Sequence, residues 1–161
     1  MATALAERPI SPLNLERFEE DLSHRRHRFT GDDLIRLDEL GFLDPEKKYE
    51  LLDGEILEIM PANPPHAAIV GVVEEILRNA FGAGYCTREE KAVRIDPYYD
   101  PHPDVAVLKG SRRDFLRRYP TREETVLVVE VSDSSVKFDR RRKQEAYALG
   151  DLPEYWLVNL V

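Results

Sequence analysis

The most hydrophobic segment of the chain is Thr-Val-Leu-Val-Val-Glu-Val at residues 125–131. Continuous apolar character of this kind predicts a strand that is buried on both faces. Residues 105–108 and 155–160 predict two further strands, and the alternation at residues 92–95 is also typical of a strand. Two short runs, 49–52 and 55–59, are joined by Asp-Gly, which favours a tight β-hairpin.

Apolar residues at helical spacing predict helices between these strands. One begins after Thr30, a capping residue, and ends at Gly41; others span residues 66–81, 111–119 and 139–149. In the helix at 66–81, the residues expected on the buried face are Ile69, Val72, Val73, Ile76, Leu77 and Ala80, and those expected on the solvent face are Glu74, Glu75 and Arg78. The order of these helices and strands along the chain predicts an α/β or α+β fold, with a mixed sheet flanked by helices and an N-terminal β-hairpin.

The length of 161 residues fits one domain. We expect residues 1–29 to form an N-terminal arm with a short helical pattern at Leu13–Leu22, and residues 30–161 to form the domain. The basic cluster His24–Arg28 can contact phosphates, although next to a terminus it more often belongs to a solvated arm.

Composition narrows the function classes. There are 23 Lys plus Arg against 31 Asp plus Glu, a net charge of −8, which argues against a protein that holds nucleic acid by bulk charge alone. The one cysteine, Cys86, excludes an internal disulfide framework. No apolar run approaches the roughly 20 residues of a membrane span, and no secretory signal is visible. We therefore expect a cytoplasmic protein with no membrane partner.

Two acids stand out against this apolar background. Glu130 lies in the strand predicted to be buried, where an ionised carboxylate costs several kcal/mol unless it is paired, protonated or bound to a metal. Asp104 follows Pro103 and opens another strand. Acids at the ends of neighbouring strands can converge on a cation such as Mg²⁺. The alternatives are a solvent-exposed strand end or a structural ion pair for Glu130.

A lysine on the last predicted helix extends this group. Asp139, Lys143 and Tyr147 are four residues apart and so share one helix face. Lys143 could point back towards Glu130, where a cation can stabilise charge on a phosphate. Alternatively, Lys143 forms a surface pair with Asp139.

Several segments in this order resemble the Uma family of restriction-type endonucleases, within the PD-(D/E)XK nuclease superfamily. The resemblance covers roughly residues 30–161. The segments are Tyr49-Glu50-Leu51-Leu52-Asp53-Gly54-Glu55, Pro64-Pro65-His66, Pro103-Asp104-Val105-Ala106-Val107, Val129-Glu130-Val131-Ser132-Asp133-Ser134-Ser135, Asp139 with Lys143 and Tyr147, and Pro153-Glu154-Tyr155-Trp156-Leu157-Val158.

The resemblance implies a restriction-endonuclease-like fold and a site at which Asp104 and Glu130 bind Mg²⁺ or Mn²⁺. Ser132 stands where the superfamily ordinarily has its lysine, and Lys143 matches the family's alternative place for it. Glu50 also matches the pattern, as a further ligand or water-orienting group, or else as one half of a cross-strand charge pair. His66 matches as a phosphate contact or proton donor, or else as a helix cap.

The function implied is a metal-dependent DNA endonuclease. Phosphate contacts are expected from basic residues on exposed helix faces, unless these serve only solvation; they are Arg112, Arg113, Arg117, Arg118 and Arg140–Arg142. The alternatives are a catalytically weak nucleic-acid-binding or protein-interaction module with the same fold, and a hydrolase of smaller phosphoesters. Relatives commonly continue with further strands after the strand at 155–160. Either those strands are absent here or a partner chain completes the sheet edge; an unpaired edge favours the partner, and we therefore expect a homodimer.

Overall fold

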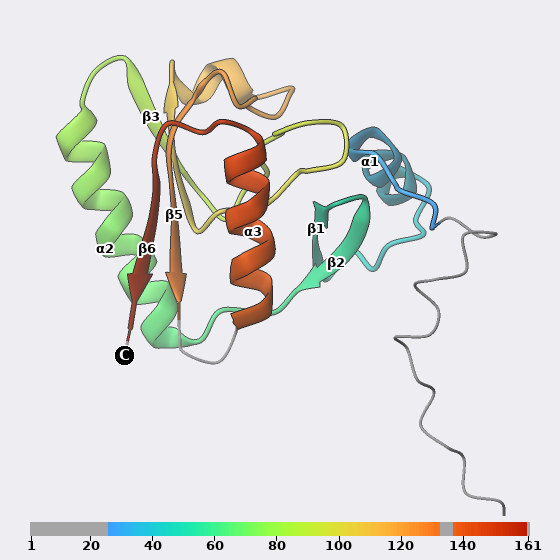
Figure 1. Ribbon diagram of the computed structural model, residues 1–161. Helices are drawn as coiled ribbons and strands as arrows, with labels where there is room; N and C mark the ends of the chain where they lie inside the picture. The colour runs from blue at the N-terminus through green and yellow to red at the C-terminus, as the bar shows by residue number, and fades with distance from the viewer. Residues whose placement is uncertain (1–25, 133–136, 161) are drawn as a thin grey trace, which may run out of the picture.

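The computed structural model describes residues 26–132 and 137–160, with the side chains of 137–140 excepted. The expected short helix at Leu13–Leu22, together with His24 and Arg25, lies outside the described residues. The described part contains two sheets and three α-helices (Figure 1). In this part of the chain, no helix combines the length and apolar character that crossing a membrane requires.

A four-stranded mixed sheet forms the centre of the fold. Its order is β3-β4-β5-β6, in which β5 and β6 are parallel and the other pairs are antiparallel. The strands are β3 (Tyr85–Glu89), β4 (Val105–Lys109), β5 (Thr125–Ser132) and β6 (Tyr155–Asn159). The expected mixed sheet is confirmed, and so is the strand predicted at 125–131 to be buried on both faces.

The N-terminal hairpin is also confirmed. Strands β1 (Lys48–Leu52) and β2 (Glu55–Ile59) pair in antiparallel fashion. The turn residues Asp53 and Gly54 have φ angles of 54° and 74°, the left-handed values that a tight hairpin turn needs. Backbone hydrogen bonds between Leu51 and Asp100 connect the hairpin to the loop that precedes β4.

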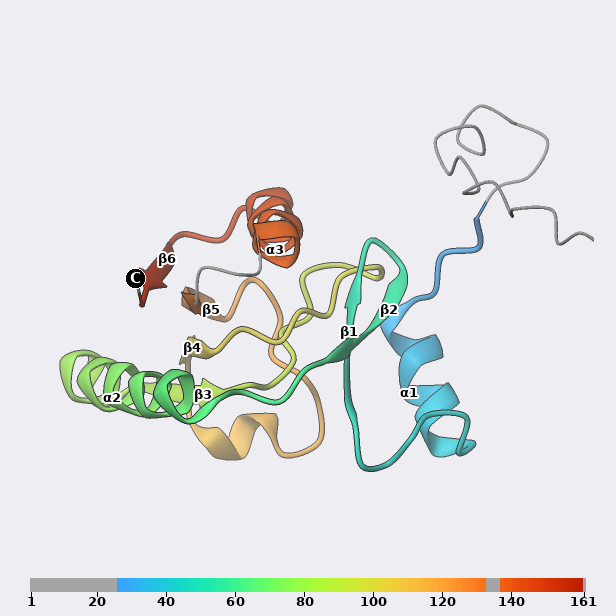
Figure 2. The same cartoon turned by 90° about the horizontal axis from the view of Figure 1, so that it is seen from below.

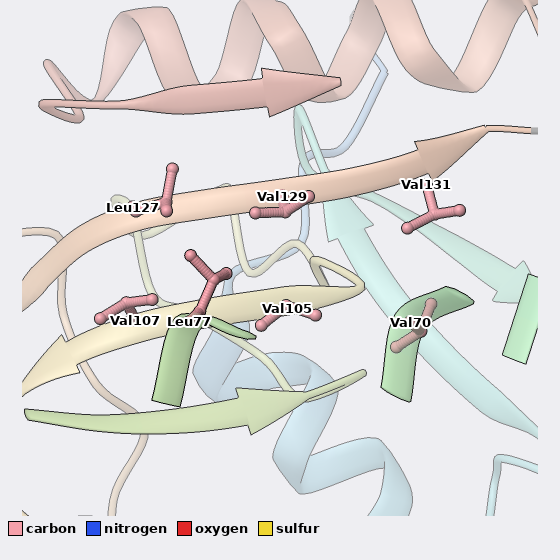
Figure 3. Close-up of a cluster of buried hydrophobic side chains, with 7 residues drawn as sticks. All are labelled: Val70, Leu77, Val105, Val107, Leu127, Val129 and Val131. Carbon is pink, nitrogen blue, oxygen red and sulfur yellow. The ribbon is translucent and has the colours of Figure 1, made fainter. Parts of the chain in front are cut away.

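Helices cover both faces of the four-stranded sheet. Helix α2 (Pro64–Phe81) packs on one face and α3 (Lys137–Leu149) lies on the other (Figure 2). The side chains of a strand alternate between faces, so β4 and β5 contribute to two cores. The cluster under α2 contains Val70, Leu77, Val105, Val107, Leu127, Val129 and Val131 (Figure 3). The cluster on the other face contains Val93, Ile95, Ala106, Leu108, Phe115, Val128 and Tyr147.

Helix α1 (Gly31–Glu39) begins where the sequence predicts. The Thr30 side chain accepts a hydrogen bond from the Asp33 N–H, and the Asp33 carboxylate accepts one from the Thr30 N–H, which completes a capping box. The first residue of the helix, Gly31, is buried against Asp100 and Arg94. These two side chains form a hydrogen-bonded ion pair at 2.8 Å.

Two predicted elements are wrong. Residues 92–95 form no strand, although all but Arg94 are buried. Three of their N–H groups bond to loop carbonyls instead: Val93 to Pro101, Arg94 to Pro120 and Ile95 to Tyr99. The helix expected at residues 111–119 is a single 3₁₀ turn, η2 (Arg112–Phe115). Of this segment, only Phe115 is buried, which is too little apolar surface to stabilise a longer helix.

The expected faces of α2 also need correction. Glu74, expected in solvent, is buried, whereas Val72 and Ile76 are 52% and 59% exposed. Glu74 accepts hydrogen bonds from the Thr87 hydroxyl and from Arg78 and Arg112, so its charge is compensated. The helix is rotated by about one residue from the face that apolar periodicity alone predicts.

The burial of Gly31 makes it sensitive to a single added methyl group. A Cβ there would clash with Asp100 Oδ2 and with Arg94 Nη2, so Gly31→Ala must displace a largely buried ion pair. We expect it to lower the free energy of unfolding by about 1–3 kcal/mol. Gly71, inside α2, has no atom within 4 Å of the same position. Gly71→Ala should therefore raise stability by about 0.5–1 kcal/mol. Urea denaturation of both variants checks the opposite signs, and equal effects would contradict the packing at Gly31.

Candidate active site

Two acids lie side by side at one end of the four-stranded sheet. Asp104 directly precedes β4, and Glu130 lies near the end of β5. The antiparallel register pairs Val105 with Val129. Continued by one residue, this register brings Asp104 opposite Glu130, and directly opposite residues share one face. The pairing of β4 with β5 therefore brings these two carboxylates together, as the sequence predicts.

Lys143 on α3 joins this group. Its Nζ donates to the main-chain oxygen of His102 at 2.9 Å and lies 3.4 Å from Glu130 Oε2 and 3.3 Å from Glu50 Oε2. An ammonium group has three N–H donors, so these three oxygens can engage all of them. The lysine side chain is 13% exposed. Lys143 thus faces the acids rather than the solvent.

Glu50 reaches the same cluster from the hairpin. It lies on β1 opposite Leu57, so the strand pairing puts no opposite charge directly across from it. Its Oε2 instead accepts a hydrogen bond from the His102 N–H at 3.0 Å and faces Lys143. The side chain is 8% exposed. Glu50 therefore links the hairpin to the sheet through the loop that precedes Asp104.

His66 contacts Asp104 from the first turn of α2. Its Nε2 lies 3.0 Å from the Val131 carbonyl oxygen and 3.3 Å from Asp104 Oδ2. A carbonyl oxygen can only accept, so Nε2 carries the proton and His66 is a donor here. Asp104 Oδ2 also accepts the Val131 N–H at 2.6 Å. The helix cap is Asn63, whose side chain accepts the His66 N–H.

Burial and the neighbouring charges shift the pKa values of the groups in this cluster. Burial raises the pKa of Glu130 to about 7; Lys143 opposes this rise and Asp104 adds to it. Burial likewise raises the pKa of Asp104, although the hydrogen bond from the Val131 N–H and the charge of Lys143 both lower it. For Lys143, burial favours the neutral form, but the charges of Glu130, Glu50 and Asp104 outweigh it and raise the pKa of the lysine. The ammonium is therefore firmly charged.

The structure adds two residues that were not among the predicted site residues. Tyr147 donates its hydroxyl to Glu130 Oε1 at 2.6 Å. His102 contributes its backbone N–H and carbonyl to Glu50 and Lys143, and burial together with nearby lysines lowers the pKa of its ring to about 4. The helical spacing of Lys143 and Tyr147 was a usable signal for the tyrosine. No signal pointed to His102, because its contacts with Glu50 and Lys143 use main-chain atoms.

The predicted arginines of residues 112–118 lie away from the acids. Residues 112–118 follow the end of β4, whereas Asp104 precedes its beginning, so the length of the strand separates them from the acids (Figure 1). Arg112 is paired with Glu74, and Arg118 with Glu124 at 2.5 Å. On α3, Arg142 binds Glu55 of the hairpin. The side chain of Arg140 lies outside the described residues.

The donor set suits a hard divalent cation. Three carboxylates, from Glu50, Asp104 and Glu130, face the single charge of Lys143 in a buried setting. Among the described residues, no group of three or more His, Cys, Asp or Glu side chains already encloses one point. Mg²⁺ commonly uses one or two carboxylates and keeps several waters, so Asp104 and Glu130 fit this mode of binding.

Comparisons with known proteins agree with this fold. The model of the Uma2 family, described as "Putative restriction endonuclease", matches residues 32–161. A crystal structure of "a putative nuclease belonging to DUF820" from Anabaena variabilis superposes with a TM-score of 0.55 at 15% sequence identity, covering 76% of this chain and 73% of that one. Among curated proteins, none has significant sequence similarity to the chain. The structural match establishes the shared fold.

The raised pKa of Glu130 predicts a pH dependence of stability in metal-free protein. Between the unfolded pKa of about 4.5 and the folded pKa of about 7, the folded state holds a proton that the unfolded state releases. The free energy of unfolding therefore falls as pH rises through this window. Glu130→Gln should remove this contribution, on the order of 1–3 kcal/mol between pH 5 and pH 8.

Urea denaturation in EDTA at pH 5, 6, 7 and 8 measures this difference. Glu145→Gln is the matched control, because Glu145 also lies near Lys143 in the sequence of α3 but is 58% exposed and paired with Arg141. Its stability profile should follow that of the parent. A Glu130→Gln profile parallel to the parent profile would contradict the raised pKa.

Proposed function

The chain belongs to the Uma2 family, and from this premise we propose that it is a divalent-metal-dependent endonuclease that hydrolyses phosphodiester bonds in DNA. The observation that carries the proposal is the buried cluster of Glu50, Asp104 and Glu130 around Lys143. Glu50 comes from the middle of β1, Asp104 from the residue before β4 and Glu130 from near the end of β5, and Lys143 comes from α3. Burying three carboxylates next to one another costs free energy. A divalent cation bound between them for a reaction on a phosphate would offset that cost.

Asp104 and Glu130 would hold Mg²⁺ or Mn²⁺. When bound, the cation stabilises negative charge on the phosphoryl group and lowers the pKa of bound water. His66 and the Val131 N–H keep Asp104 oriented. Glu50 and the His102 carbonyl hold the Lys143 ammonium beside Glu130. From there Lys143 can stabilise the developing charge or orient the attacking water.

Positive charge at the rim of the cluster supports phosphate binding. Lys48 pairs with Glu90, whose backbone N–H donates to the Asp104 carbonyl oxygen, and Lys91 is the next residue along the chain. Lys48 is paired with Glu90 and is 53% exposed, and Lys91 is exposed. A DNA phosphate could compete with Glu90 for Lys48. These lysines are better situated for contacts near the scissile bond than the arginines that follow β4.

A non-catalytic nucleic-acid-binding module is the second candidate. It is favoured by Ser132 at the superfamily's lysine position, and by the engagement of Lys143 with three protein oxygens. In that case the lysine serves charge compensation alone. Tight DNA binding without cleavage, unchanged by EDTA, would select this candidate over the nuclease.

Plasmid cleavage with Mg²⁺, Mn²⁺ or EDTA tests the nuclease proposal. We expect cleavage with either cation and none in EDTA. Asp104→Asn should be at least about 100-fold slower, the scale that follows removal of one charge-stabilising group from an active site. Asp38→Asn changes an exposed aspartate on α1 and should cut like the parent. A parent that is inactive with every cation, or an equally active Asp104→Asn variant, would overturn the proposal.

A homodimer stays a prediction. In the described sheet β6 is the last strand, and its Trp156 and Leu157 are 49% and 41% exposed. An edge strand with exposed apolar side chains offers both backbone and side-chain contacts to a second copy. Size-exclusion chromatography coupled to light scattering should give a molar mass twice the 18.6 kDa of one chain. Trp156→Lys should shift the mass towards the monomer, whereas a monomeric parent would contradict the prediction.

A further inference from the structure

Tyr147 is the group that holds the second oxygen of Glu130. Its hydroxyl donates to Oε1 at 2.6 Å, while Oε2 faces Lys143 at 3.4 Å. Tyr147 and Lys143 are one helical turn apart on α3. One face of this helix therefore contacts both oxygens of one carboxylate on β5, and the two contacts differ: a neutral hydroxyl on Oε1 and a charged ammonium beside Oε2.

The tyrosine has little freedom to move. It is 1% exposed and belongs to the hydrophobic cluster that includes Ile95, Ala106 and Val128. Its ring centroid lies 5.5 Å from that of Tyr155 on β6. A ring packed in this way keeps its hydroxyl at one place, since rotating it would open a cavity in the core. The hydroxyl is thus a rigid donor rather than an adjustable one.

We propose that Tyr147 is a positioning residue of the nuclease site, whose hydroxyl fixes the orientation of the Glu130 carboxylate and so pre-organises it to bind the divalent cation. This inference rests on the proposed function. A phenylalanine would fill the same volume in the core, so packing alone does not require the hydroxyl. Groups that orient a metal ligand typically contribute 10- to 100-fold to metal affinity.

A purely structural hydroxyl would have a different signature. It would satisfy a buried acceptor, and its loss would lower stability without a selective effect on metal binding. Tyr99→Phe is a matched control, because Tyr99 packs against the same cluster but directs its hydroxyl towards Asp53. Both variants remove one hydroxyl from a ring that contacts this cluster; Tyr99 is only partly buried, and of the two hydroxyls the one of Tyr147 contacts Glu130.

Calorimetric titration of the full chain with Mn²⁺, in the absence of DNA, is the first test. Tyr147→Phe should bind Mn²⁺ 10- to 100-fold more weakly than the parent, and Tyr99→Phe should bind it equally well. Plasmid cleavage by Tyr147→Phe should recover as Mn²⁺ is raised, which a general loss of structure would not allow. If Tyr147→Phe does not fold, the same substitution is made together with Gly71→Ala, which we expect to stabilise α2.

A crystal structure of metal-free Tyr147→Phe tests the orientation itself. The Glu130 carboxylate should be rotated relative to the parent. An unchanged carboxylate, or an unchanged Mn²⁺ affinity, would overturn the inference. If the parent binds no Mn²⁺ at all, the proposed metal site fails instead, and the orientation of Glu130 in the variant still decides whether Tyr147 positions it.

Discussion

The burial of negative charge at one end of the central sheet is the constraint on which the rest of the structure depends. Glu130 lies in a strand that contributes aliphatic side chains to two hydrophobic clusters, and an ionised carboxylate there needs a partner. Its partners, Lys143 and Tyr147, both come from α3. The position of α3 is therefore tied to the charge on β5. Glu50 connects the hairpin to the same charge through Lys143, so the geometry of the site depends on the positions of both α3 and the hairpin.

Strand register is what puts this charge on the correct face. In β5, Leu127, Val129 and Val131 face α2, whereas Val128 and Glu130 face α3. A slip of one residue would exchange the two sets and bury Glu130 among the aliphatic side chains under α2, where the described structure offers it no lysine. This is why the sequence allowed the strand and the acid to be predicted together: a single carboxylate in an apolar strand is conspicuous, and Pro103-Asp104 marks the start of the neighbouring strand.

Other parts of the structure had no comparable signal. Glu74 was expected in solvent because periodicity cannot reveal that Thr87 and Arg112, distant in sequence, would compensate its charge. Residues 92–95 alternate like a strand, yet their hydrogen-bond partners are loop carbonyls that only the folded chain supplies. Tyr147 could have been an ordinary core tyrosine of an apolar helix face. In each case the missing information was a tertiary partner rather than a local preference.

The placement of the lysine on a helix has a further consequence. A lysine on β5 itself would keep its distance from Glu130 through the covalent geometry of one strand. Lys143 instead depends on how α3 docks, which is set by the packing of Tyr147 against Tyr155 and by the bond of Arg142 to the Leu52 carbonyl. Small shifts of the helix would change the distance between the ammonium and all three acids at once. The balance of charge at this site is therefore controlled by core packing and by the hairpin, and substitutions remote from the acids can alter it.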